Sequence, residues 1–207
     1  MLKTLRLKKQ WLWCCLPALA LLCLGWADSW EGLRAAADRV TSVQAQFVQQ
    51  KHLPILAKPL ISKGTFYYQA PDSLRWEYRW PLRSILLMHH GQIKRYVEGP
   101  QGFSEEKGTN LQAMQVILGD ITQWLAGHFD DNPMFNARLE PGRKIILTPK
   151  DKALSAVIQR VELVLSRQPG VMERVLIYEG PDSYTEMIFS DTVLNQPIDS
   201  AVFQSIP

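Results

Sequence analysis

Residues 53–81 constrain the fold more than any other stretch of this sequence. They read LPILAKPLISKGTFYYQAPDSLRWEYRWP, and Pro54 and Pro59 exclude a helix at the start because proline breaks helical hydrogen bonding. In the second half, apolar residues alternate with charged ones, which is the period of a strand with one buried face. The stretch therefore predicts a long β-hairpin with one strongly apolar face. Gly64, inside its first strand, indicates a bulge or a close approach of neighbouring atoms.

The second strand of this hairpin carries most of the aromatic signal. Its alternating apolar residues, predicted to share one face, are Leu74, Trp76, Tyr78 and Trp80. Arg75 and Arg79 fall on the opposite face by the same alternation. This aromatic face must therefore be covered, either by another part of the chain or by a ligand.

Residues 1–27 have the pattern of a signal peptide. Four basic residues precede an apolar run, residues 11–24, that is too short for a comfortable membrane span. Small residues at positions 25 and 27 place a cleavage site before Asp28, and an uncleaved anchor is the alternative. The residues before Cys14 and Cys23 are large, which argues against a lipoprotein signal. We expect an exported chain with a single folded domain, residues 28–207.

Cysteine usage and charge exclude several kinds of protein. All three cysteines, Cys14, Cys15 and Cys23, lie in the leader, so the remaining chain has no disulfide, no catalytic thiol and no cysteine-based zinc site. The chain has 23 basic and 20 acidic residues, and four of the basic residues belong to the leader. Without the leader, acidic residues outnumber basic ones by one. This balance predicts no nucleic-acid partner, and it gives no sign of an anionic-membrane partner.

The rest of the chain predicts a mainly β protein. About ten short strands follow one another in hairpin order, which favours a curved antiparallel sheet. Helices are expected in only two places: a short one capped by Asp28 or Ser29, and a longer region, Leu111–Phe129, with apolar residues at spacings of three and four. These helices must cover either the sheet face or the mouth of a half-barrel.

The sequence contains little that predicts an enzyme. The motifs of serine hydrolases, zinc proteases and P-loop nucleotide-binding proteins are absent. His89 and His90 are adjacent at a predicted strand end, so their side chains are expected on opposite faces, which disfavours a shared metal ion. His128, on an apolar helix face, is expected to be a core or rim residue. We predict no catalytic residue, no metal and no cofactor.

What the sequence does contain is a large set of aromatic residues that alternation places toward one interior. The simplest interpretation is an ordinary hydrophobic core, and the functional interpretation is a cavity that takes an apolar ligand. Periodicity alone does not separate the two. The residues concerned are Phe47, Phe66, Tyr68, Trp76, Tyr78, Trp80, Tyr96 and Trp124.

Four motifs in order resemble a known family. The first is VQAQFVQ at 43–49, and the second combines Gly64-Thr65-Phe66, Ala70-Pro71 and Leu74-Arg75-Trp76. The third is LTPK at 147–150, and the fourth is NQPID at 195–199, followed by Phe203 and Pro207. Together they resemble the periplasmic outer-membrane lipoprotein carriers, the LolA-like proteins. Residues 51–64 are similar to a divergent branch associated with lipid or polyene pigment export.

The resemblance implies an incomplete antiparallel β-barrel whose open side is covered by helices. It implies a periplasmic carrier whose cavity takes the acyl chains of a lipoprotein from an inner-membrane transporter and passes them to an outer-membrane acceptor. Burial of a sixteen-carbon chain would contribute at most about 12 kcal/mol, at about 0.8 kcal/mol per methylene. The expected cavity residues are Phe47, Phe66, Tyr68, Trp76, Tyr78, Leu86, Met88, Tyr96, Met114, Leu118, Ile121, Trp124, Leu163 and Met187.

One position departs from the family pattern. The resemblance implies an arginine just before the hairpin proline, where it holds the lid and affects onward transfer, but this chain has Ala70 there. The departure predicts a specialised carrier with a different cargo or acceptor. Three alternatives remain: a lipid-binding envelope sensor domain, an envelope enzyme using His52, Glu77 and His89, and a structural protein with a filled core.

Overall fold

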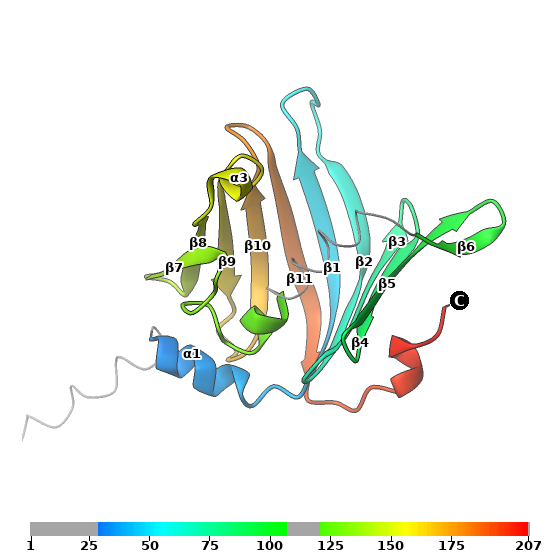
Figure 1. The fold of residues 1–207 in the computed structure, drawn as a ribbon, viewed down its shortest axis with the longest axis horizontal. Helices are drawn as coiled ribbons and strands as arrows, with labels where there is room; N and C mark the ends of the chain where they lie inside the picture. Colours follow the sequence, from blue (N-terminus) through cyan, green and yellow to red (C-terminus); the bar gives the residue numbers. More distant parts are fainter. Residues whose placement is uncertain (1–28, 107–120, 207) are drawn as a thin grey trace, which may run out of the picture.

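The computed structural model describes residues 29–106 and 121–206, which form one curved antiparallel sheet (Figure 1). Eleven strands are described, in the spatial order β6-β5-β4-β3-β2-β1-β11-β10-β9-β8-β7. The first six are β1 (Ser42–His52), β2 (Leu60–Gln69), β3 (Ser73–Trp80), β4 (Ser84–His89), β5 (Gln92–Gly99) and β6 (Gly102–Glu105). The last five are β7 (Phe135–Glu140), β8 (Lys144–Pro149), β9 (Arg160–Leu165), β10 (Met172–Tyr178) and β11 (Tyr184–Leu194).

The sheet consists of two hairpin meanders that join where β1 pairs with β11. It does not close into a barrel, because β6 and β7 remain as its two edges. The predicted fold class, a mainly β protein with an open curved sheet, is therefore confirmed. The edge strand β6 is short and ends at Glu105.

Alternation of burial along β1 shows why the sequence forms this sheet. Val43, Ala45 and Phe47 are buried, whereas Gln46 between them is exposed. Residues of one parity therefore face the interior, as the pattern predicted. The 53–81 hairpin is also present, as β2 and β3.

Gly64 marks a bulge, as predicted. Gly64 pairs with Tyr78, but Lys63 pairs with Trp80, so Arg79 is an extra residue on β3. The extra residue reverses the alternation of side chains, so residues after the bulge point to the opposite face of the sheet from the one that simple alternation predicts. Trp80 consequently leaves the aromatic face, lines no pocket and is 53% exposed, contrary to the alternation that grouped it with Trp76 and Tyr78.

The helices are few and short. They are α1 (Trp30–Ala37), α3 (Lys152–Ser155), the 3-10 helix η1 (Ser200–Phe203) and a helical stretch at 121–125. The Ser29 hydroxyl caps α1 by accepting a hydrogen bond from the Gly32 amide at 3.1 Å. The predicted helical region 111–129 lies partly outside the described residues, and its described part begins at residue 121. No helix in the described ranges has the length and apolar character needed to cross a membrane.

The chain between β6 and β7 connects the two edges of the sheet. The helical stretch within it lies in front of the sheet in Figure 1, where Ile121 and Leu125 pack on one core cluster and Trp124 on another. Trp124 contacts Phe135 of β7 edge-to-face, with 6.0 Å between ring centres. The described part of the predicted lid therefore covers the aromatic side of the sheet.

The opposite side of β3 is covered as well, by the C-terminal segment. Arg75 donates hydrogen bonds to the carbonyls of Val202 (3.0 Å) and Ser205 (2.8 Å), and its Nε pairs with Glu77 at 2.8 Å. Both charged residues are buried for this reason. Phe203, also buried, stacks on His89 with 6.2 Å between ring centres.

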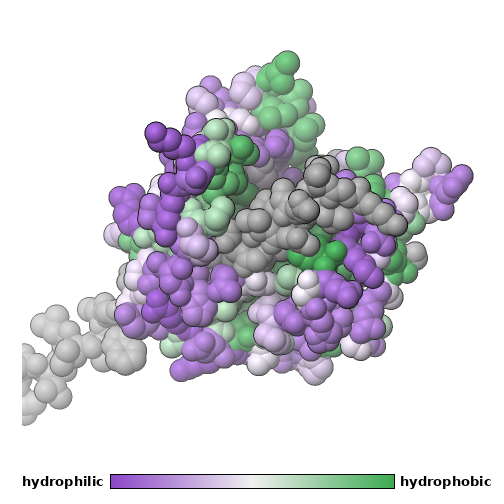
Figure 2. Space-filling model, viewed as in Figure 1, coloured by the Kyte–Doolittle hydropathy of each residue, from purple (hydrophilic) through white to green (hydrophobic). Residues whose placement is uncertain are grey.

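Hydrophobic residues also gather on the surface, at the end of the molecule that carries the β1–β2 loop (Figure 2). That loop projects beyond the rest of the sheet (Figure 1).

Candidate functional site

Two adjoining pockets lie on the concave side of the sheet. The wider has a volume of about 480 Å³ and extends toward the end with the β1–β2 loop, where Ser62, Pro81 and Leu82 line it. The narrower, about 150 Å³, extends toward the other end, where Val43 and Gly170 line it. Four residues line both, so the pockets form one continuous site along the sheet: Trp76, Ile121, Ile177 and Met187.

Strand geometry brings these residues together. Successive side chains of a strand point to opposite faces, so residues of one parity from each strand meet on the concave side. The parity is odd in four strands, which contribute Val43, Ala45 and Gln49 (β1), Val161 (β9), Val175 and Ile177 (β10), and Thr185, Met187 and Phe189 (β11).

Aromatic rings form the floor between the pockets. Phe47 is 1% exposed and meets Trp76 and Tyr78 edge-to-face, at 5.6 and 5.1 Å between ring centres. Phe66 meets Trp76 at 5.3 Å, and Phe189 packs against the same group. These edge-to-face contacts hold the rings in fixed orientations, so the floor presents a stable apolar surface.

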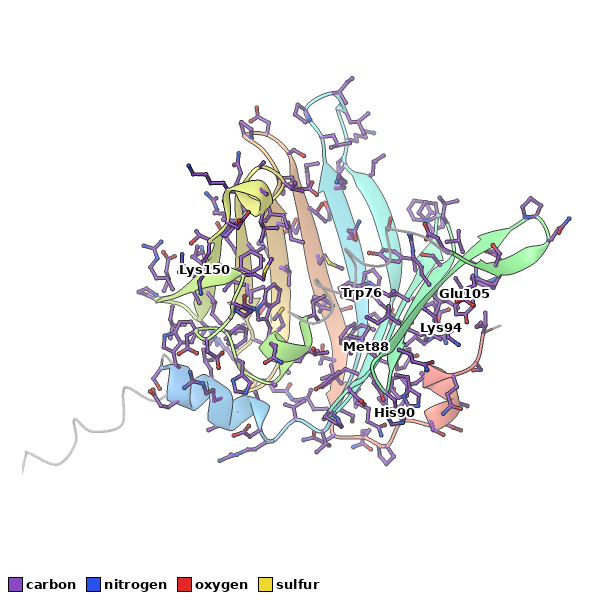
Figure 3. The ribbon with its side chains drawn as sticks, viewed as in Figure 1. Trp76, Met88, His90, Lys94, Glu105 and Lys150 are labelled. Atoms are coloured by element: carbon purple, nitrogen blue, oxygen red, sulfur yellow. The ribbon has the colours of Figure 1, made fainter. Side chains whose placement is uncertain are left out.

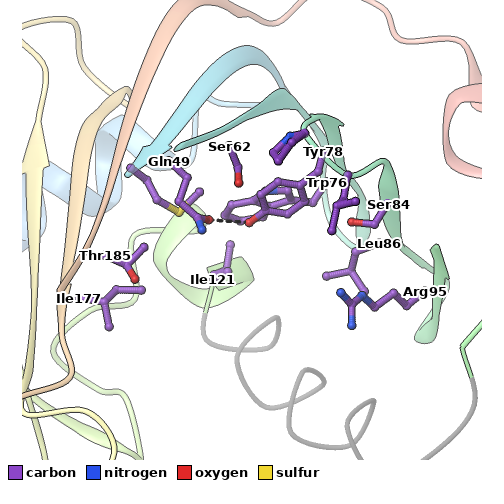
Figure 4. A pocket seen from close by; sticks show the side chains of 13 residues that line it. Gln49, Ser62, Trp76, Tyr78, Ser84, Leu86, Arg95, Ile121, Ile177 and Thr185 are labelled. Carbon is purple, nitrogen blue, oxygen red and sulfur yellow. Dashed lines mark hydrogen bonds between the residues drawn. The ribbon is translucent and has the colours of Figure 1, made fainter. Parts of the chain in front are cut away.

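The polar groups of the site are sparse. The Tyr78 hydroxyl donates a hydrogen bond to Gln49 Oε1 at 2.7 Å (Figure 4). Burial raises the pKa of Tyr78 to about 12, against smaller opposing effects of Trp76 and the charge of Arg95. Among the described residues, Arg95 is the one charged side chain that lines the wider pocket, and the narrower pocket has none. Arg95 pairs with Glu106 at 2.6 Å.

The structure places seven of the predicted cavity residues on the pocket walls: Phe66, Trp76, Tyr78, Leu86, Ile121, Trp124 and Met187. Four others lie in the buried core beside the pockets: Phe47, Tyr68, Met88 and Leu163. Figure 3 shows Trp76 and Met88 within the strands β3 and β4. Met114 and Leu118 fall outside the described residues.

Tyr96 is not at the site. It pairs with Ile85, whereas the neighbouring pair, Leu86 and Arg95, lines the wider pocket. Neighbouring residues of a strand point to opposite faces, so Tyr96 belongs to the convex side. The prediction that it faces the cavity is wrong because its strand register was not visible in the sequence.

Ala70, the predicted handover position, lies in the exposed turn between β2 and β3. Its amide donates to the Thr41 carbonyl at 3.0 Å, and it lines neither pocket. The turn lies at the opposite end of β3 from Pro81 and Leu82, and so at the opposite end from the wide pocket.

Several residues of the site were missed by sequence reasoning. Phe189, Gln49 and Ile177 all line a pocket and were not among the predicted residues. A signal for Phe189 existed, because it shares the parity of Met187 on the same strand. Gln49 carried the same signal, because it shares the parity of Phe47 on β1, but a glutamine in a strand is usually exposed and so was not expected to line a cavity.

The histidines are spread over the structure and serve local contacts. His89 bonds Ser73 (Nδ1 to Oγ, 2.7 Å), His128 meets Asp131 at 3.1 Å, and His52 stacks on Tyr184. The rings of His89 and His90 lie 4.0 Å apart, so the expectation of opposite faces is wrong. His90 has left the strand and occupies a turn with φ of 48°. The described residues hold no group of three or more metal-binding side chains.

The fold and the site together define an open curved-sheet protein with an apolar pocket on its concave face. The family model of the outer membrane lipoprotein carrier protein LolA matches residues 38–205, and the chain belongs to this family. The family is one of carrier and binding proteins, so the pocket is a candidate binding site.

Solved structures with a similar fold come from several bacteria. A chain in the MucA/MucB complex of Pseudomonas aeruginosa is 18% identical with a TM-score of 0.51, covering 85% of this chain and 60% of that one. A LolA superfamily protein from Nitrosomonas europaea is 12% identical with a TM-score of 0.42, covering 83% and 96%. At these identities the likeness is one of fold. No curated protein matches the sequence significantly.

Proposed function

We propose that this protein is a periplasmic carrier that shields the acyl chains of a lipoprotein, or of a related lipid, between the inner and outer membranes. The observation that supports this most directly is the continuous concave pocket, whose described walls include one charged side chain. Membership of the lipoprotein carrier family supports the same function.

The dimensions and chemistry of the pocket suit an acyl chain. A volume of about 480 Å³ for the wider part is within the usual range for ligand pockets, roughly 300–1,000 Å³. The aromatic floor and Met187 pack against an acyl chain through van der Waals contacts, which require no hydrogen bonds from the ligand. Gln49, Tyr78 and Arg95 line the wider pocket together with the hydroxyl residues Ser62, Ser84 and Thr185, and these polar groups suit the ester or headgroup end of a lipid.

The route of the cargo follows from the same proposal. The leader, residues 1–27, directs the chain to the periplasm and is removed, leaving one domain, residues 28–207. An inner-membrane lipoprotein-releasing transporter loads the pocket, and an outer-membrane acceptor unloads it. The helical stretch at 121–125 lies over the pocket and is the element that must move for loading, because Ile121 lines both of its parts.

Ala70 makes the handover of this carrier differ from the family pattern. No arginine side chain is available at that turn to hold the lid. If Ala70→Arg slows the release of bound lipid to acceptor vesicles, the position tunes handover. If the release rate is unchanged, Ala70 has no such role.

The test of the carrier proposal is mass spectrometry of organic extracts from protein purified out of the periplasm without detergent. Acylated lipoprotein or its lipid-bearing peptide would establish the conventional cargo. Phospholipid, fatty acid or a pigment ester would establish a carrier for a non-lipoprotein lipid. Empty extracts, together with a stripped protein that binds no hydrophobic dye, would show that the pocket is not a lipid site.

The likeness to the MucA/MucB complex supports a second candidate, a lipid-binding sensor that holds a partner protein. The two functions separate in one experiment with lipid-loaded protein. A carrier gives its lipid to acceptor vesicles, whereas a sensor keeps the lipid and gains or loses a protein partner as the lipid is added.

A further inference from the structure

We propose that the end of the molecule with the β1–β2 loop docks on an anionic lipid bilayer. Of the eight large apolar side chains that are strongly exposed in the described part of the chain, six lie on the β1–β2 loop, the adjoining start of β2, the end of β3 and the turn before β4. We call them the apolar rim: Ile55, Leu56, Leu60, Ile61, Trp80 and Leu82. Ile55 is 88% exposed and Leu82 77%, values that are unusual for aliphatic residues in such a concentration.

The topology brings the rim together. β1 runs into the β1–β2 loop and β3 runs into the turn before β4, so the loop and the turn lie at the same end of the sheet. Cross-strand pairs link them, with Lys51 opposite Leu60 and Lys63 opposite Trp80. Figure 2 shows hydrophobic residues over the projecting end of this hairpin.

The charges around the rim are of one sign. Residues 51–63 and 79–83 contain no Asp or Glu. Lys58 and Lys63 are exposed and have no ion pair among the described residues. Three nearby carboxylates are neutralised: Glu77 is buried beside Arg75 and Arg79, Glu98 pairs with Arg83, and Glu179 pairs with Lys51. Asp182, in the β10–β11 turn, is exposed.

This combination matches the chemistry of a negatively charged membrane surface. Exposed lysines are attracted to anionic headgroups, tryptophan favours the headgroup boundary, and aliphatic side chains enter the acyl region. The charge balance of the whole chain gives no sign of such a partner because it averages over every face of the molecule. A projecting and irregular apolar tip also suits fluid lipid better than a protein partner, which requires a complementary packed surface.

The rim is continuous with the wider pocket. Leu82 belongs to both, and Pro81 and Ser62 line the same end of the pocket. A lipid chain leaving the bilayer at the rim therefore meets apolar side chains until it reaches the aromatic floor. Docking at this end removes the need for the chain to cross water.

The first test measures flotation of the processed chain with vesicles of phosphatidylcholine containing phosphatidylglycerol. We expect binding, and we expect the double variant Ile55→Asp with Leu60→Asp, at two rim residues that line neither pocket, to bind about tenfold more weakly or worse. Val193→Asp is the matched control, because Val193 is 45% exposed but lies near the far end of β11. If some of the protein retains its leader, any vesicle binding by the leader is the same in the variant and in the control.

The second test addresses charge. Lys58→Glu combined with Lys63→Glu should reduce binding to the anionic vesicles by more than about tenfold, and Lys94→Glu on β5 should not. Binding should weaken with added salt and with pure phosphatidylcholine. Tryptophan fluorescence should be quenched by brominated lipid, and Trp80→Phe should remove most of that quenching.

The proposal is overturned if anionic vesicles are not bound, or if the rim variants bind as well as Val193→Asp. It is equally overturned if rim variants change only self-association or the capture of a periplasmic protein. Dye binding to the pocket, measured on the same variants, keeps the outcome separate from the carrier proposal. If the rim variants bind the dye normally but no longer float with the vesicles, the rim serves docking and not ligand binding.

Discussion

Gly64 shows how one residue fixes the centre of the sheet. A Cβ atom at this position would lie 1.9 Å from the Glu77 carbonyl oxygen and 2.6 Å from Phe47 Cζ. Neither neighbour is free to retreat, because one is backbone and the other is the most buried ring of the aromatic floor. The glycine therefore allows Phe47 to sit against the strand that carries Trp76 and Tyr78.

Gly64→Ala should lower the free energy of unfolding by roughly 2 kcal/mol or more, since overpacking a close contact forces backbone and ring to shift. Denaturant unfolding measures the change. Gly99→Ala is the matched control, because its nearest neighbour would be 3.8 Å away. Equal stability of the two variants would contradict the close-contact interpretation.

Tyr78 makes stability depend on alkaline pH. Its pKa in the folded protein is about 12, above the ordinary value of 10.0, so between these values the unfolded chain loses the proton first. The stabilisation is complete below pH 10 and disappears as pH rises through 12, amounting to about 3 kcal/mol at most. Tyr78→Phe should show a shallower loss of stability over this range. If the free energy of unfolding falls equally with pH in both proteins, Tyr78 is not the cause of the pH dependence.

At the scale of elements, the C-terminal segment is an integral part of the sheet. Asn195 accepts a hydrogen bond from the Thr41 amide at 2.7 Å and donates one to the Arg39 carbonyl at 2.9 Å. Further along, Phe203 is buried against β3 and β4, and Arg75 is satisfied by two carbonyls of this segment. The segment thus covers the convex face of the strands that carry the aromatic floor on their concave face.

Phe203→Ala should destabilise the protein by about 3 kcal/mol, because a large buried ring is lost and the cover over Arg75 loosens. Thermal or denaturant unfolding provides the measurement. Gln204→Ala, at an exposed neighbour, should change stability by less than about 0.5 kcal/mol. A small effect at Phe203 would mean that the segment is not needed for the sheet.

The sequence predicted the strands well and their registers poorly. Alternation in residues 43–49 and 74–78 identified β1 and β3 and the side chains on their concave faces. Arg79 and Trp80 were misplaced because a bulge shifts the register without leaving a distinct local pattern. Helix α3 was missed although Asp151 caps it, with Oδ1 accepting from the amides of Ala153 and Leu154. Tyr96 was misassigned because the facing of β5 depends on its pairing with β4.

At the scale of the whole molecule, the concave pocket makes ligand binding and stability interdependent. A ligand that binds only the folded protein at a hundred times its Kd stabilises it by about 2.7 kcal/mol. For a domain of this size we expect the Tm of the lipid-stripped protein to rise by about 5–10 °C on adding an apolar ligand such as a long-chain fatty acid.

Ser62→Trp should abolish this rise, because Ser62 points into the wider pocket in Figure 4 and a larger side chain would fill it. Lys63→Trp is the control on the next residue, whose side chain points to the other face. A Tm rise that persists in Ser62→Trp would place the ligand outside the wider pocket.

The pairing of β1 with β11 also determines when this protein is able to fold. Each meander forms from neighbouring hairpins, but the seam between them joins segments from the two ends of the folded region, such as His52 with Tyr184. Contacts so distant in sequence form slowly. A chain that emerges from a narrow channel with its N-terminus first is unable to complete the sheet before residues 184–194 emerge, so the seam between the two meanders closes last.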